Sequence, residues 1–138
     1  MTSRENGQRW LEQADEDLRW TQHLLEAGAY YLACFLSQQV GEKALKALLY
    51  SLGEEYLIGH SVEQLCRSVS AHLPELGDHC ESWKYLDNFY ISTRYPDALP
   101  GSIPARVYNK DAADGAVRIA VEIVAVVHGR MDQAQVKS

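Results

Sequence analysis

The stretch NFYISTRYPDALPGS, residues 88–102, holds the side chains of this sequence that are best suited to binding chemistry. Arg94 offers a planar guanidinium that can grip a phosphate or carboxylate through two parallel hydrogen bonds. Tyr90 and Tyr95 flank it and offer rings that can stack on a base. Asp97 can lock the arginine or accept a hydrogen bond from a ligand. These residues predict an anion-and-ring binding site; the alternative is a helix connection in which Arg94 and Asp97 pair with each other.

Three prolines stiffen the segment that carries this candidate site. Pro96, Pro100 and Pro104 fix their own φ angles and push the residues before them out of the helical region. A stiff loop loses less conformational entropy when it orders around a ligand. We therefore expect residues 91–108 to form a stiff, Pro-rich loop between two helices.

A second polar group lies in the segment SQQVGEKALK. On a helix, Gln39, Lys43 and Lys46 fall at positions i, i+4 and i+7 and share one stripe, while Glu42 lies beside Lys46 as an i,i+4 pair. The stripe predicts a polar lining that faces the Arg94 loop. The alternative is a solvated helix face, whose ion pairs contribute roughly a few tenths of a kcal/mol each.

The remaining reactive residue types show no pattern typical of a catalytic or metal site. The five histidines form no HxxxH array, and the three cysteines are odd in number and have no CxxC spacing. Arg67 and His72 form a literal Arg-x4-His, but residues five apart on a helix do not face each other. No P-loop, GxGxxG or GxSxG motif is present. The sequence therefore predicts no metal, no cofactor and no disulfide framework.

Length, composition and charge limit the classes of protein to which this chain can belong. The chain has 138 residues, 46% of them hydrophobic and 23% charged, which is typical of one compact globular domain. A formal net charge of −6 disfavours broad binding to nucleic acid through phosphate neutralisation, although it leaves room for a local cationic pocket. MTSRENGQRW has no apolar signal region, and no apolar run is long enough to span a bilayer. We expect a cytoplasmic protein that is not embedded in a membrane.

Hydrophobic periodicity predicts the elements that position these residues. A first helix is expected from about Ser3 to Ala27, ended by Gly28, and a second from Ala29 to about Leu52, ended by Gly53. Gly41 lies inside the second helix, where glycine costs about 1 kcal/mol relative to alanine. It indicates either close approach of another helix or a tolerated glycine.

The second half of the chain predicts three more helices. Ser61 and Gln64 form a capping-box pattern that opens the third helix, and the fourth is expected from Pro74 to about Tyr90. The last helix begins at Asn109 or Asp111 and contains the run VRIAVEIVAVV, whose length without a turn signal favours a helix over a strand. The prediction is an all-α, up-down antiparallel bundle of about five helices, forming a single domain over residues 1–138.

The last helix also predicts self-association. Val121, Val124, Ala125 and Val126 extend its apolar surface beyond a single stripe. A helix of this kind in a small bundle usually has a second surface to cover. We therefore expect a homodimer.

Three motifs in order, FLSQQVGEKALKALL, GHSVEQL and LDNFYISTRYPDALPGS, resemble the HEPN domain, the higher eukaryote and prokaryote nucleotide-binding domain. The resemblance covers about residues 10–128. It implies a helical bundle that is frequently a homodimer, and a gene often paired with a minimal nucleotidyltransferase in a toxin–antitoxin-like arrangement. Members of the family are either metal-independent ribonucleases or non-catalytic binders of nucleotides, RNA or partner proteins.

One departure from the family pattern bears on activity. The ribonucleases carry Arg-x4-6-His, and Arg94 stands where that arginine is expected, but no histidine follows it between Tyr95 and Gly101. General acid–base catalysis by a histidine contributes about 10²–10⁴-fold, which phosphate binding alone does not replace. The expectation is a non-catalytic nucleotide- or partner-binding module. The alternatives are a ribonuclease with a divergent motif, in which Asp97 or Lys43 would serve, and an oligomerisation adaptor with a buried Arg94 paired to Asp97.

Overall fold

The computed structural model describes residues 1–137, and the side chains up to residue 133. Those residues form α-helices and 3-10 helices and no β-strand, which confirms the all-α bundle. In chain order the elements are α1 (Ser3–Glu26), α2 (Tyr30–Ser51), α3 (Val62–His72), η1 (Pro74–His79), α4 (Cys80–Trp83), η2 (Lys84–Phe89), η3 (Pro96–Ala98), α5 (Pro104–Val107) and α6 (Lys110–Lys137).

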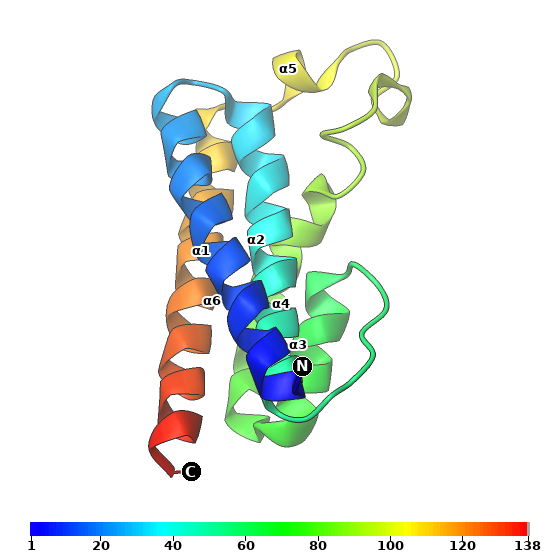
Figure 1. Cartoon of the computed structure of the whole chain (residues 1–138). Helices are drawn as coiled ribbons and strands as arrows, with labels where there is room; N and C mark the ends of the chain where they lie inside the picture. The colour runs from blue at the N-terminus through cyan, green and yellow to red at the C-terminus, as the bar shows by residue number, and fades with distance from the viewer. Residues whose placement is uncertain (138) are drawn as a thin grey trace.

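The long helices α1, α2 and α6 form one half of the bundle, and α3 with the η1–α4–η2 run packs against α2 on the other side (Figure 1). α1 and α2 are antiparallel, and the start of α1 and the end of α6 lie toward the same end of the molecule (Figure 1). The connection after α2 runs back along that helix. It is held there by the buried Gln38, which donates from Nε2 to the carbonyl oxygen of His60 at 2.8 Å. As a result α3 begins beside the middle of α2.

The ends of the first two helices follow the sequence prediction. Thr2 and Glu5 form a reciprocal capping box at the start of α1. Gly28 has φ +80° and Gly53 has φ +104°, so each supplies the left-handed residue that ends a helix at no steric cost. These caps fix where α1 and α2 stop.

The start of α3 differs in part from the predicted capping box. Ser61 Oγ accepts from the backbone N–H of Gln64 at 3.1 Å, as predicted. The second half of the cap comes from a distant residue: Asp87 accepts from the N–H groups of Val62 and Glu63 at 2.7 and 3.1 Å. A carboxylate at a helix N-terminus satisfies donors that the helix cannot and complements its dipole. Asp87 thereby ties η2 to the beginning of α3.

The prediction of one continuous fourth helix is wrong, because residues 74–89 form a 3-10 helix, one turn of α-helix and a second 3-10 helix. Cys80, Trp83, Leu86 and Phe89 recur at a spacing of three, and all four are buried. A 3-10 helix has three residues per turn, so it keeps such a series on one face, whereas an α-helix would rotate it away. The apolar spacing explains why this segment winds tightly.

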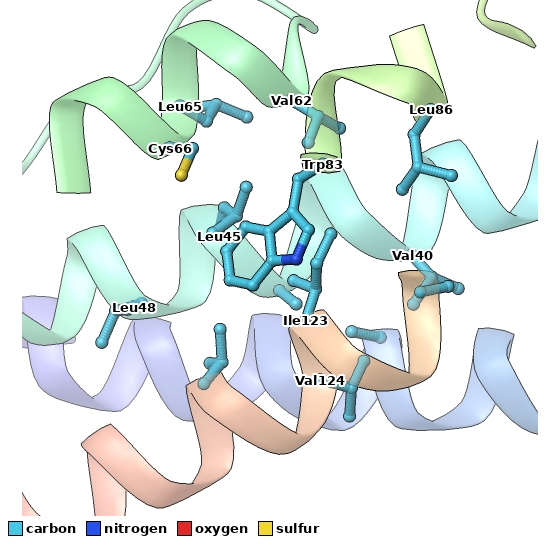
Figure 2. Close-up of a cluster of buried hydrophobic side chains, with 14 of the residues drawn as sticks. Val40, Leu45, Leu48, Val62, Leu65, Cys66, Trp83, Leu86, Ile123 and Val124 are labelled. Carbon is cyan, nitrogen blue, oxygen red and sulfur yellow. The ribbon is translucent and has the colours of Figure 1, made fainter. Parts of the chain in front are cut away.

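The core lies where α2, α3, η2 and α6 meet. Figure 2 shows the fully buried Trp83 close to Leu45 of α2 and Ile123 of α6. A Cβ atom on Gly41 would come within 2.9 Å of Leu86 Cδ1 and 3.2 Å of Ile123 Cδ1. Gly41 therefore marks a close approach of neighbouring elements, which was one of the two interpretations of its presence in a helix.

The last helix is capped by Asn109, whose Oδ1 accepts from the N–H of Ala112 at 3.0 Å. Its predicted apolar side is buried: Val117, Ala120, Ile123, Val124 and Val127. On its other side Val121 is 39% exposed, and Ala125 is also exposed. The helical interpretation of the β-branched run is confirmed, and part of its extra apolar surface faces outward.

The connection between η2 and α6 contains two short helices, η3 and α5, that the sequence did not predict. In the described part of the chain, no helix has the length and apolar content required to cross a membrane.

Candidate functional site

Arg94 lies just beyond the end of η2, and its side chain rests on aromatic rings. Its guanidinium carbon is 4.7 Å from the ring centre of Tyr90, 5.1 Å from that of Tyr95 and 5.6 Å from that of Phe35. Such contacts hold a cation while leaving its hydrogen-bond donors unused. The residue is exposed, and within residues 1–133 it forms no ion pair or hydrogen bond through its side chain.

Asp97 does not pair with Arg94. It lies in η3, is exposed, and has no ion-pair partner among the described side chains. The alternative in which these two residues lock each other in a packed helix connection is therefore not the arrangement of this structure. The guanidinium is left available to an anion from outside the chain.

Hydrogen bonds to the ends of η2 and α5 hold the turn that presents Arg94. The buried Thr93 donates from Oγ1 to the carbonyl of Phe89 at 2.6 Å, and Ser92 donates to the carbonyl of Asn88 at 2.6 Å. The hydroxyl of Tyr108 donates to Ser92 Oγ. The turn is thus anchored from both sides, which positions the arginine without the need for a charged partner.

His60 joins this group, and the sequence did not predict it. Its ring stacks on Tyr90 with a centroid separation of 4.9 Å and an interplanar angle of 18°. Its Nδ1 lies 2.9 Å from Glu42 Oε1, and its side chain is 55% exposed. Tyr90 therefore contacts both Arg94 and His60, which are distant in sequence.

The carboxylate of Glu42 orients the imidazole. An ionised carboxylate at Nδ1 favours the tautomer with the proton on that nitrogen, which leaves Nε2 as an acceptor. Within the described residues, Nε2 of His60 has no hydrogen-bond partner. The only sequence signal for this histidine was its place directly before the Ser61 cap, since neither Glu42 nor Tyr90 is near it in the chain.

The predicted lysine stripe turns away from Arg94. Lys46 is buried; its Nζ is 3.6 Å from Glu42 Oε2 and 5.5 Å from the ring centre of Trp10. Lys43 Nζ binds Asp17 Oδ2 of α1 at 2.5 Å. Both lysines are therefore paired with carboxylates, Lys46 within α2 and Lys43 across to α1.

Gln39 donates from Nε2 to Gln38 Oε1 at 2.7 Å, and so supports the buried glutamine that holds the His60 loop. Of the residues predicted for the site, Tyr90 and Tyr95 each contact Arg94. Gln39, Lys43, Lys46 and Asp97 make no hydrogen bond, ion pair or ring contact with Arg94 among the described side chains.

Exposed apolar side chains lie close in the chain to this group. Ile58 is 95% exposed in the loop that leads to His60, while Ile91 and Tyr95 are 55% and 52% exposed beside Arg94. Tyr56, which is 86% exposed, lies earlier in the same loop with Ser3 and Tyr50. No set of three or more His, Cys, Asp or Glu side chains in the described region could hold a metal ion. The site therefore combines one unpaired cation, one oriented imidazole and several open aromatic or aliphatic surfaces.

This arrangement of long helices around a short 3-10 run defines a small all-α bundle domain. The chain belongs to the HEPN domain family, whose model matches residues 8–130. Among proteins with curated functions, none matches the chain.

Several solved structures share this fold. The protein TT1696 from Thermus thermophilus is 42% identical, with a TM-score of 0.78 over 89% of this chain and 96% of that chain. ST0689, an archaeal HEPN homologue, is 35% identical, with a TM-score of 0.74 over 91% and 97%. An HEPN domain protein from Thermotoga maritima is 31% identical, with a TM-score of 0.65 over 90% and 98%.

Proposed function

We propose that this HEPN domain is a non-catalytic module that binds a nucleotide at Arg94. The single observation that carries the proposal is that Arg94 is exposed, rests on three rings and has no carboxylate partner among the described residues. A guanidinium in this state can give two parallel hydrogen bonds to a phosphate, and charge-assisted bonds of this type contribute about 1.5–3 kcal/mol.

The surroundings of Arg94 support a ligand with a ring as well as a charge. Tyr95 is about half exposed, and Ile91 beside it is also open. Stacking of a base on an aromatic side chain contributes about 1–3 kcal/mol and tolerates every base. A nucleotide supplies both the phosphate and the ring, whereas inorganic phosphate supplies only the first.

The charge distribution favours a small ligand over a long nucleic acid. The chain carries a net charge of −6, and Lys43 and Lys46 are already paired with acids. Binding to a polynucleotide backbone normally uses several unpaired cations along a groove. The single guanidinium held on aromatic rings at this site is instead matched to one phosphate group.

Calorimetric titration with ATP, GTP, CTP and UTP, together with inorganic phosphate, tests this proposal. Arg94→Ala should weaken nucleotide binding by about 10-fold or more, because the charge-assisted bonds are lost. Its thermal midpoint should change little, since the side chain is exposed. Arg94→Lys should be intermediate, because an ammonium keeps the charge but not the fork. Arg106→Ala is the matched control, as Arg106 is an exposed arginine of the same connection.

Two results would count against nucleotide binding at Arg94. One is the absence of measurable heat with every nucleotide. The other is an equal loss of affinity in Arg94→Ala and Arg106→Ala, which would indicate a diffuse charge effect.

A second candidate function, RNA cleavage without a metal, is favoured by one observation. His60 stacks on the same tyrosine as Arg94, and its Nδ1 is held by Glu42. With Nε2 as an acceptor, the imidazole could remove the proton of a ribose 2′-hydroxyl while Arg94 holds the phosphate. Incubation with total RNA in a chelator distinguishes the functions. Cleavage that His60→Ala abolishes, and that His72→Ala leaves intact, would establish the ribonuclease.

The proposal extends to association. We expect a homodimer, and a nucleotidyltransferase-like partner of the toxin–antitoxin type, because Ile58 near His60 and Val121 on α6 leave apolar surface exposed. Light scattering at micromolar concentration should give twice the chain mass of 15.5 kDa. A mass equal to that of one chain would remove the homodimer, and co-purification with the product of the neighbouring gene tests the partner.

A further inference from the structure

Two cysteines from different elements meet inside the second half of the bundle. Cys66 lies in α3 and Cys80 is the first residue of α4, and both are buried. Their Sγ atoms are 2.6 Å apart, although the residues are 14 positions apart in the chain. The spacing of the cysteines in the sequence gave no sign of this pair, because only the turn through η1 brings α4 back onto α3.

Among the described residues, the two thiols have few other polar partners and no metal-binding cluster. Cys66 Sγ has one further polar neighbour, the carbonyl oxygen of Leu76 at 3.7 Å. Metal binding would require a third ligand, and the described residues contain no cluster of three ligand side chains. Cys34, the third cysteine, is buried in α2 and makes no hydrogen bond in this part of the chain. The pair is therefore an isolated dithiol.

We propose that Cys66 and Cys80 form a reversible disulfide that joins α3 to α4. A bridge needs the two sulfurs to meet without backbone movement, and packing of α3 against η1 and α4 already brings them together. This modification is independent of the nucleotide proposal. It is compatible with either candidate function of the site.

The chemistry is an exchange with a low-molecular-weight disulfide. A thiolate of the pair attacks one sulfur of the small disulfide, forms a mixed disulfide and releases one small thiolate. The second protein thiolate then attacks the sulfur of the first cysteine and releases the other small thiolate. Two electrons pass from the cysteines to the small disulfide, and the two protons leave with the released thiols.

Burial sets the rate of this exchange. The apolar surroundings and the neighbouring Cys80 thiol raise the pKa of Cys66, so little thiolate is present at neutral pH. We expect oxidation to proceed through transient opening of α3 from α4, and the finished bridge to resist reduction for the same reason. The bridge would fix the position of α3, whose N-cap Ser61 directly follows His60, relative to the run that leads from α4 to Tyr90.

The test uses the purified full chain, equilibrated with mixtures of reduced and oxidised glutathione, then denatured in N-ethylmaleimide and weighed by mass spectrometry. Oxidised samples should accept one maleimide, on Cys34, while reduced samples accept three. A proteolytic map should show the peptides of Cys66 and Cys80 joined. Because the bridge closes a short loop, the thermal midpoint of the oxidised protein should be higher by roughly 10 °C.

Matched variants make the assignment specific. Cys34→Ala should keep the bridge, whereas Cys66→Ala and Cys80→Ala should each lose it. Three maleimides on the wild-type chain after equilibration at every glutathione ratio would overturn the proposal. So would a glutathione adduct that persists on one cysteine, or a disulfide that links two chains. The mass measurement on the wild-type protein decides the matter even if a variant fails to fold.

Discussion

Replacing Glu42 with alanine should strongly destabilise this protein, because the side chain is the buried junction between the core and the candidate site. Its side chain is 6% exposed. The carboxylate lies 3.6 Å from the ammonium of Lys46, whose side chain is 7% exposed, and 2.9 Å from Nδ1 of His60. Removing it leaves the buried ammonium without a counter-charge and removes the partner that orients the imidazole.

The magnitude follows from the exposure of the two partners. Breaking a buried pair by deleting one member costs about 3–5 kcal/mol, because the remaining charge stays desolvated. Contact with the Trp10 ring at 5.5 Å gives Lys46 some compensation, so we expect about 3 kcal/mol. For a chain of this length that corresponds to a fall in the thermal midpoint of roughly 10 °C.

Urea unfolding followed by circular dichroism measures the loss. Asp114→Ala is a matched control, because Asp114 and Lys110 form another i,i+4 pair at the same distance of 3.6 Å, but with side chains that are 43% and 70% exposed. Solvent screens such a pair, so this variant should change the free energy of unfolding by less than about 0.5 kcal/mol. The double variant Glu42→Leu with Lys46→Met should recover most of the stability lost in Glu42→Ala.

Equal stabilities of Glu42→Ala and Asp114→Ala would refute this reasoning. They would mean that water reaches Lys46 in solution and that the Glu42 pair behaves as a surface pair. A double variant less stable than Glu42→Ala would refute the assignment of the cost to the uncompensated charge.

Gly41→Ala should lower the free energy of unfolding by about 1–2 kcal/mol. The new methyl group would overlap Leu86 and crowd Ile123, and the cost of that overpacking exceeds the gain in helix propensity. Gly129→Ala, where the same methyl group meets open space in α6, should raise it by about 0.5–1 kcal/mol, and urea unfolding of both variants checks the pair. A pH series tests Cys34, since burial raises the pKa of its thiol from 9.0 to about 12. As the pH rises, the thiol loses its proton in the unfolded state before it does so in the folded state. Its contribution to stability should therefore be present below pH 9 and be lost between pH 9 and 12. Over that range the free energy of unfolding of the parent should fall relative to that of Cys34→Ala.

Much of the scaffold was predictable because it depends on short-range patterns. The bounds of α1 and α2, the left-handed glycines after them and the cap at Asn109 follow from residues within one or two turns of each other. The burial of one side of α6 follows equally from its apolar spacing. The broken run at residues 74–89 was missed because a spacing of three fits a 3-10 helix and is also tolerated in a short α-helix.

The candidate site also contains some features set by residues close in the chain and others set by tertiary packing. That Arg94 stands between two tyrosines in a stiff segment is a local fact, and the contacts with Tyr90 and Tyr95 follow from it. That Arg94 is free of Asp97, however, depends on how the turn is anchored by Ser92, Thr93 and Tyr108. Sequence spacing could not choose between a paired and an unpaired arginine.

The sequence by itself determined the all-α class, the ends of the long helices and the two tyrosines around Arg94, because each depends on neighbours a few residues away. The third ring against Arg94, that of Phe35, comes from α2 and depends on tertiary packing. Only the tertiary structure decided that Lys43 and Lys46 are neutralised and that His60 meets Tyr90. Those outcomes join residues from different helices, and the partner of a charge or ring is set by which elements pack together. Because the connection after α2 runs back along that helix, His60 stacks on Tyr90, the same ring that contacts Arg94. The segment that contains Arg94 has no histidine of its own.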